Sequence, residues 1–133
     1  MLDIQSKTVN AKVPVTVLQI VGDIDSSNFQ FFQNYVDEQV EQGARHILLN
    51  FQEVERISSA GLRVIHNLFK KLRDIHKDVD DDELRKKMST GSYKSPYLKL
   101  TDLAPNVADI FNLGGFDIYI EIFKDENTAV NSF

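Results

Sequence analysis

Residues 45–65 read RHILLNFQEVERISSAGLRVI and contain an apolar run, a short polar connection and the start of an amphipathic helix. The run His46–Phe51 is short and almost entirely apolar, which is typical of a buried strand. The helix begins around Ser58–Ala60 and continues to about His76. Its apolar positions recur at spacings of three and four: Leu62, Ile65, Leu68, Phe69, Leu72 and Ile75. This stretch therefore predicts a strand followed by a surface helix.

The residues before this stretch predict another strand and another helix. Val13–Val21 alternates and is rich in β-branched residues, which predicts a strand. The following helix ends at about Gln42, because Gly43 is typical of the position after a helix end. Its N-cap candidates are Ser26, Ser27 and Asn28. With the run that follows, these elements form a strand–helix–strand unit.

The residues after the second helix repeat the alternation of strands and helices. Tyr97–Leu100 predicts a strand, and Pro105–Leu113 predicts a short helix that begins with proline. Gly114–Gly115 stops that helix. Phe116–Ile122 alternates and predicts a last strand, and Lys124–Phe133 predicts a weak terminal helix.

Residues 77–96 differ in composition from the rest of the chain. Asp78–Glu83 contains five acidic residues, and the basic run Arg85–Lys87 follows. This composition predicts a charged, flexible and exposed insertion with a short helix near Glu83–Met88. A connection of this length is either functional or disordered.

The order of these elements predicts an α/β fold. Strands that alternate with helices favour one mixed, mostly parallel sheet covered by about four helices. A chain of 133 residues fits a single domain, residues 1–133, that includes the insertion.

Composition excludes several classes of function. The net charge of −5 argues against non-specific nucleic-acid binding, and no apolar run is long enough for membrane insertion. The chain has no cysteine, which excludes thiolate metal sites and fits a reducing compartment such as the cytoplasm. The N-terminal residues carry no apolar run typical of a signal peptide.

No motif predicts catalysis, so we expect no enzyme activity, no metal and no cofactor. The three histidines, His46, His66 and His76, lack the spacing of metal ligands and are expected to be ordinary core or surface residues. The chain contains neither the GxxxxGK(S/T) nor the GxGxxG motif, the two glycine-rich motifs that bind phosphate. A nucleophile elbow around Ser59 would require glycine two residues earlier, where this chain has Ile57.

The serine pair at the start of the second helix is the strongest candidate for a functional site. One of Ser58 and Ser59 is expected to cap the helix, which leaves the hydroxyl of the other exposed in the first turn. The small residues Ala60 and Gly61 are expected to let another surface approach closely. Read without any other information, this segment favours a plain helix cap.

Two motifs change that interpretation. Residues 45–65 resemble the STAS domain of bacterial anti-sigma factor antagonists, in which a D-S-S/T-G-L element opens a helix after a strand. Val21–Asp25, VGDID, resembles the G-E/D-L/I-D turn of the same family, and the spacing between the two motifs matches. The resemblance covers nearly the whole chain except the insertion.

The resemblance assigns the phosphorylated serine of the family to Ser59, with Ser58 as second choice. Aligning Gly61–Leu62 with the motif places Ala60 at its second serine or threonine and Ser58 at its aspartate. The substitution of the aspartate by Ser58 and the charged insertion are the two departures from the family pattern.

The resemblance implies a partner-switching role and its binding partners. These are an anti-sigma factor with kinase activity, which phosphorylates Ser59, and a serine phosphatase that removes the phosphate. The expected partner-binding residues are Asp23, Asp25, Ser58, Ser59, Arg63 and Asn67. The oligomeric state is left open between a monomer and a homodimer.

Two alternatives remain at this point. The chain could be a non-phosphorylated STAS scaffold subunit of a stressosome-type or lipid-transport assembly, which the replacement by Ser58 favours. The second alternative is an enzyme of unknown class, and a deep pocket near Asp23, Asn50 and Ser59 would favour it.

Overall fold

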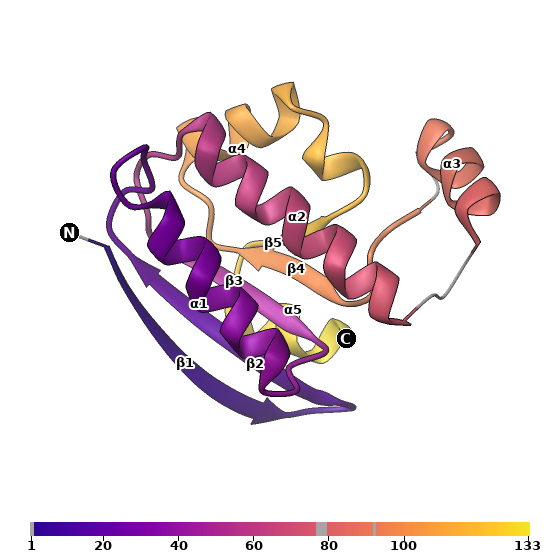
Figure 1. Cartoon of the computed structure of the whole chain (residues 1–133), viewed down its shortest axis with the longest axis horizontal. Coiled ribbons are helices and arrows are strands. Elements are labelled where there is room, and N and C mark those ends of the chain that lie inside the picture. The colour runs from indigo at the N-terminus through magenta and orange to yellow at the C-terminus, as the bar shows by residue number, and fades with distance from the viewer. Residues whose placement is uncertain (1, 77–79, 92) are drawn as a thin grey trace.

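The computed structural model describes residues 2–76, 80–91 and 93–133 and contains one five-stranded sheet (Figure 1). The strand order is β1-β2-β3-β4-β5, with β1 antiparallel to β2 and all other neighbours parallel. The strands are β1 (Asp3–Asn10), β2 (Pro14–Val21), β3 (Ile47–Glu53), β4 (Leu98–Thr101) and β5 (Glu121–Phe123). The predicted α/β class with a mixed, mostly parallel sheet is confirmed.

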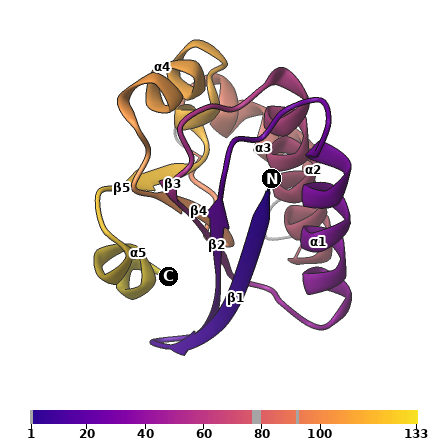
Figure 2. The ribbon, with the colours of Figure 1, turned by 90° about the vertical axis from the view of Figure 1, so that its left-hand side faces the viewer.

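Helices cover both faces of this sheet. They are α1 (Phe29–Glu41), α2 (Ser59–His76), α3 (Asp81–Ser89), α4 (Pro105–Leu113) and α5 (Glu126–Ser132), one more than the predicted four. Figure 2 shows α1 and α2 on one side of the sheet and α5 on the other. None of the helices in the described ranges is long and apolar enough to cross a membrane.

The buried side chains form two clusters, one on each face. Leu18 and Ile20 of β2 join the larger cluster together with Phe32 of α1. Val15 and Val17, which point to the opposite face, join a smaller cluster that α5 covers. Because both faces of β2 are buried, its sequence is apolar at nearly every position.

Strand β1 was not predicted from the sequence. It pairs with β2 without a break from Asp3↔Val21 to Asn10↔Pro14. Among its residues only Ile4 is buried, at 6% exposure, and six of the eight are exposed. An edge strand that buries so little has no clear apolar alternation, and this explains why the pattern was missed.

The insertion is more ordered than predicted. Its helix α3 is confirmed and begins earlier than expected, because the Asp80 side chain accepts a hydrogen bond of 2.7 Å from the Glu83 amide. Tyr93 and Ser95 are buried at 4% and 1% exposure, so the prediction of an exposed segment up to residue 96 is wrong at its end. The parts at residues 77–79 and 92 lie outside the described residues.

The predicted strand Phe116–Ile122 is wrong in its first half. Gly115 has a φ of 75°, and the chain turns there into the short 3₁₀ helix η1 (Phe116–Ile118). The Phe116 ring packs edge-on against Phe111 of α4 with 5.5 Å between the ring centroids. Pairing in the sheet begins only at Glu121.

Candidate functional site

The ends of β2 and β3 bring the two sequence motifs together. Beyond the last paired residues, Gly22 donates its amide hydrogen to the Glu53 carbonyl at 3.0 Å. Ile24 then forms an isolated parallel bridge with Ile57. In this bridge the Ser58 amide donates to the Ile24 carbonyl at 2.9 Å. The two motifs, which are far apart in the chain, therefore lie side by side.

Ser58 and Ser59 have different roles at the start of α2. The Ser58 side-chain oxygen accepts a hydrogen bond of 3.3 Å from the Gly61 amide, and its carbonyl accepts one of 3.0 Å from Leu62. Ser58 is therefore the N-cap and is half-buried. Ser59 is the first residue of α2 and is exposed. The predicted division between a capping serine and an exposed serine is confirmed.

Gly61 allows a close contact inside the protein. A Cβ atom at this buried position would lie 2.6 Å from Cγ2 of Ile24 and 2.8 Å from Cγ1 of Ile57. Real Cβ atoms do not approach other carbons so closely, so glycine is needed for α2 to rest on the bridge. The expectation that Gly61 opens the site to another protein is wrong, because the surface that approaches it is internal.

A network of hydrogen bonds fixes the loop that carries the two aspartates. The Asn28 side chain donates to the Asp23 carbonyl at 2.8 Å and accepts from the Asp25 amide at 2.9 Å. Asn28 occupies the predicted N-cap position of α1, but its side chain holds this loop instead of capping the helix. The Asp23 carboxylate accepts from the Arg56 amide at 3.2 Å, which joins the two motifs again.

Asp25 is exposed and carries a stabilised negative charge. Its carboxylate accepts hydrogen bonds from the hydroxyl and the amide of Ser27, the latter at 2.8 Å. These bonds, from the hydroxyl first and the amide second, hold the pKa of Asp25 below its usual value. The roles of Ser27, Asn28 and Arg56 were not predicted, although polar residues beside a G-D-I-D turn are a usable signal for them.

The remaining two predicted residues extend the site along α2. Arg63 and Asn67 are exposed and follow Ser59 at spacings of four, so the three side chains lie on one face of the helix. The structure therefore brings Asp23, Asp25 and Ser58 together at the loop. From there the predicted surface extends along α2 through Ser59, Arg63 and Asn67.

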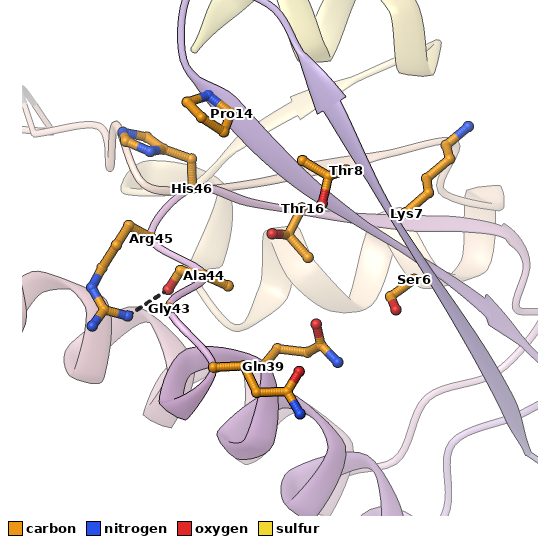
Figure 3. A pocket seen from close by; sticks show the side chains of 11 residues that line it. Ser6, Lys7, Thr8, Pro14, Thr16, Gln39, Gly43, Ala44, Arg45 and His46 are labelled. Atoms are coloured by element: carbon orange, nitrogen blue, oxygen red, sulfur yellow. Dashed lines mark hydrogen bonds between the residues drawn. The ribbon is translucent and has the colours of Figure 1, made fainter.

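The predicted site lies apart from the groove at the other end of β2. A groove of about 650 Å³ lies at the opposite end of β2, between the β1–β2 hairpin and the end of α1. Figure 3 shows Thr8, Thr16 and Gln39 around this groove, and Ser59 is not among the residues that line it. In the part of the chain that the structure describes, no group of three histidine or acidic residues could hold a metal ion.

The histidines pack against aromatic rings. At the amino ends of β3 and β4, His76 stacks on Tyr97 at 3.7 Å, and its ring centroid lies 5.6 Å from that of His46. Burial, and then the neighbouring His76 and Lys99, lower the pKa of His46. Both histidines are half-buried, and these contacts fit the expectation of ordinary core or surface residues, but the approach of His46 to His76 was not predicted.

His66 packs elsewhere, between α2 and η1. Its Nδ1 lies 3.1 Å from the Tyr119 hydroxyl. Burial, and then Lys70, lower the pKa of His66, and burial raises the pKa of Tyr119 to about 12. Both shifts favour the uncharged form of the side chain.

Comparison with known proteins identifies the family. A STAS domain model matches residues 6–79, which is more than half of the chain. The chain belongs to the STAS domain family. The matched residues include both motifs, and the matched part of this STAS domain ends just before α3.

Relatives of this STAS domain are described as anti-sigma factor antagonists. BtrV of Bordetella bronchiseptica, named as a candidate anti-sigma factor antagonist, is 26% identical over 112 residues, 84% of this chain and 80% of BtrV. A structure from Thermotoga maritima with the same description has a TM-score of 0.72 at 23% identity and covers 96% of this chain and 91% of its own.

The fold is also that of SpoIIAA, which has been solved in two forms. The unphosphorylated anti-sigma factor antagonist has a TM-score of 0.63 at 15% identity and covers 97% of this chain and 96% of its own. The phosphorylated form from Bacillus has a TM-score of 0.65 at 15% identity, with 97% of each chain covered.

Proposed function

We propose that this protein is a cytoplasmic anti-sigma factor antagonist whose binding is switched off by phosphorylation of Ser59. Its partner is an anti-sigma factor with serine-kinase activity, and a serine phosphatase restores the binding form. The observation that carries this proposal is the exposed Ser59 at the first position of α2, beside the fixed loop of Asp23 and Asp25. The docking surface comprises Asp23, Asp25, Ser58, Ser59, Arg63 and Asn67.

The fold tolerates a phosphate at this position. The amide groups of the first helical turn have no partners within the helix, and the positive end of the helix dipole lies there. A negative charge at such a site is favourable by about 0.3–2 kcal/mol. SpoIIAA also supports this step, because its unphosphorylated and phosphorylated forms both share the fold of this chain.

A docked partner does not tolerate the same phosphate. Asp25 is ionised beside the site, so the surface is already acidic and a phosphate adds further negative charge. A like charge of the partner about 4 Å from the phosphate raises the free energy of the complex by about 4 kcal/mol at an effective dielectric constant of 20. This corresponds to a loss of roughly a thousandfold in affinity.

The substitution of the motif aspartate by Ser58 is compatible with this mechanism. Ser58 accepts the Gly61 amide as an N-cap, and serine and aspartate are comparable in that role. The helix start that presents Ser59 is therefore kept, while one negative charge is lost from the surface.

The phosphorylation step is tested with the purified anti-sigma factor and ATP. Intact mass and peptide mapping are expected to find one phosphate, on Ser59. Ser59→Ala is expected to remain unmodified, and Ser58→Ala serves as the matched control that is still modified. Phosphate on Ser58, or none on the wild type, would overturn the proposal.

The binding step is tested by calorimetry with the same anti-sigma factor. Phosphorylated protein and Ser59→Asp are expected to bind more weakly, by about a thousandfold for the phosphorylated form. Ser59→Ala is expected to bind like the wild type. A phosphorylated protein with full affinity contradicts the switch and leaves only a binding role.

The replacement by Ser58 favours one second candidate, a STAS scaffold subunit that is not phosphorylated. Such a subunit would bind its assembly partners, of the stressosome or lipid-transport type, through the same exposed surface. It predicts an unmodified Ser59 and stable co-purification with further STAS or transport proteins.

A further inference from the structure

Strand β1 leaves one edge of the sheet open. It lies at the end of the strand order and pairs with β2 over eight residues without a shift of register. Its sequence, DIQSKTVN, contains no proline or glycine that would interrupt pairing on the outer side. The opposite edge strand, β5, has only three residues. A long regular edge of this kind is a template for a further strand.

The hydrogen bonds of β2 show which of its residues face β1. The Thr16 amide donates to the His46 carbonyl at 2.8 Å, so Thr16 faces β3. Backbone groups of successive strand residues point to opposite sides. Val15 and Val17 therefore direct their amides and carbonyls toward β1.

The register then assigns the backbone groups of β1. Val17 lies opposite Lys7, and Val15 lies opposite Val9, so these odd-numbered residues of β1 face β2. The even-numbered residues face outward. The outward amides are those of Ile4, Ser6 and Thr8.

Helix α1 adds an exposed aromatic surface beside this edge. Gln39 of α1 lines the groove together with Ser6 and Thr8, so this flank of the helix faces β1 (Figure 3). Tyr35 and Phe31 precede Gln39 by one and two turns on the same flank. The Phe31 residue is 47% exposed, and its ring centroid lies 6.3 Å from that of Tyr35.

We propose that a second copy of this chain pairs with β1 antiparallel, about a two-fold axis at Gln5. In this register Asp3 lies directly opposite Lys7 of the second copy, and the symmetry repeats the pair. Opposite charges in facing positions stabilise antiparallel strands. A register centred on Lys7 would place two lysines opposite each other. The Asp3 and Lys7 side chains are both exposed, and Lys7 also pairs with Glu126 of its own chain at 2.8 Å.

The proposed contact lies away from α2, the helix that carries Ser59. Asp37 of α1 pairs with Lys71 of α2 at 3.3 Å, so α2 lies on the flank of α1 away from Tyr35 and Gln39. The two-fold contact joins the two β1 edges and does not use α2. Dimerisation and the proposed phosphorylation are therefore separable.

The first test measures mass in solution over a dilution series by light scattering and sedimentation. The wild type is expected to change from twice 15.2 kDa to 15.2 kDa on dilution. Ser6→Pro removes an outward amide and is expected to be monomeric, with an unchanged circular dichroism spectrum. Ser6→Ala keeps the amide and is expected to dimerise like the wild type.

The second test exchanges the charges of the facing pair. Asp3→Lys is expected to raise the dimer dissociation constant about tenfold or more, because the introduced lysine of one copy then faces Lys7 of the other. Adding Lys7→Asp to Asp3→Lys is expected to recover most of the affinity. The dissociation constant of the double variant is compared with that of Asp3→Lys and not with that of the wild type. The reason is that Lys7→Asp also removes the 2.8 Å ion pair with Glu126.

Hydrogen exchange gives a readout that does not depend on any substitution. Protection of the Ile4 and Ser6 amides, which face each other across the two-fold axis, is expected to rise with protein concentration. The Gln5 and Lys7 amides, which face β2, are expected to be protected at every concentration. A wild type that is monomeric throughout, or a dimer that Ser6→Pro and Asp3→Lys leave intact, would overturn the proposal.

Discussion

The two ends of the parallel strands are built from different contacts. At the carboxyl ends of β2 and β3, backbone amides and short polar side chains fix the loop beside Ser59 and leave its hydroxyl exposed. At the amino ends of β3 and β4, the rings of His76 and Tyr97 stack on each other, and Lys99 of β4 is only 3% exposed. Local hydrogen bonds thus maintain one end, and burial maintains the other.

This difference separates the expected consequences of substitution. At the carboxyl ends, an exposed side chain can be changed without loss of packing, so binding changes more than stability. At the amino ends, each side chain contacts several elements, so stability changes first.

The largest expected loss of stability is at the amino ends, for Lys99→Ala. Lys99 donates to the carbonyl and hydroxyl oxygens of Ser132 at 3.0 Å, pairs with Glu121 at 3.3 Å and lies 4.9 Å from the centroid of the Phe133 ring. Its removal is expected to lower the free energy of unfolding by about 3 kcal/mol in urea titrations. Lys124→Ala, an exposed neighbour, is the control. If both variants lower the free energy of unfolding equally, burial at the amino ends of the strands does not maintain stability as described.

A smaller effect is expected at the carboxyl ends, where the two serines can be compared directly. Ser58→Ala removes the cap and is expected to lower the free energy of unfolding by about 1 kcal/mol. Ser59→Ala removes an exposed hydroxyl and is expected to change it by less than about 0.5 kcal/mol. Thermal unfolding of both variants measures the difference. If Ser59→Ala is the more destabilising, the assignment of the cap is wrong.

The smallest effect is expected from protonation of His46. Its folded-state pKa lies below the ordinary value of 6.5, so the unfolded chain binds a proton that the folded protein does not. The stability contributed by neutral His46 is therefore present above pH 6.5 and is lost as the pH falls below it. His46→Gln is expected to weaken the pH dependence between about pH 7 and 5 in paired unfolding titrations. An unchanged dependence would show that His46 is not desolvated.

The sequence predicts those elements best that bury a regular apolar face. Helix α2 was located because Leu68, Leu72 and their neighbours recur at helical spacing. Strand β3 was located as a short apolar run, and β2 by its alternation and its β-branched residues. β1 was missed because most of its side chains are exposed, so no apolar alternation marks it as a strand. In η1, the alternation around Phe116 comes from contacts with α4 and not from pairing in a sheet.

The candidate site was predictable only as far as its motifs carry local information. The cap at Ser58 and the exposure of Ser59 follow from the preference of helix starts for serine. The bond from Arg56 to Asp23 and the approach of Gly61 to Ile24 depend on how distant segments meet. No local pattern encodes those distances, so they required the folded structure.

The contact of Gly61 with Ile24 also changes how the family motif should be used in genome surveys. Any chain that rests this helix on this bridge needs a residue without a Cβ at the same place, whether or not a kinase ever acts on it. In this chain the glycine is therefore required by packing, independently of any phosphorylation. Surveys for switchable members should therefore score the hydroxyl that follows the cap and treat the glycine only as a marker of correct alignment.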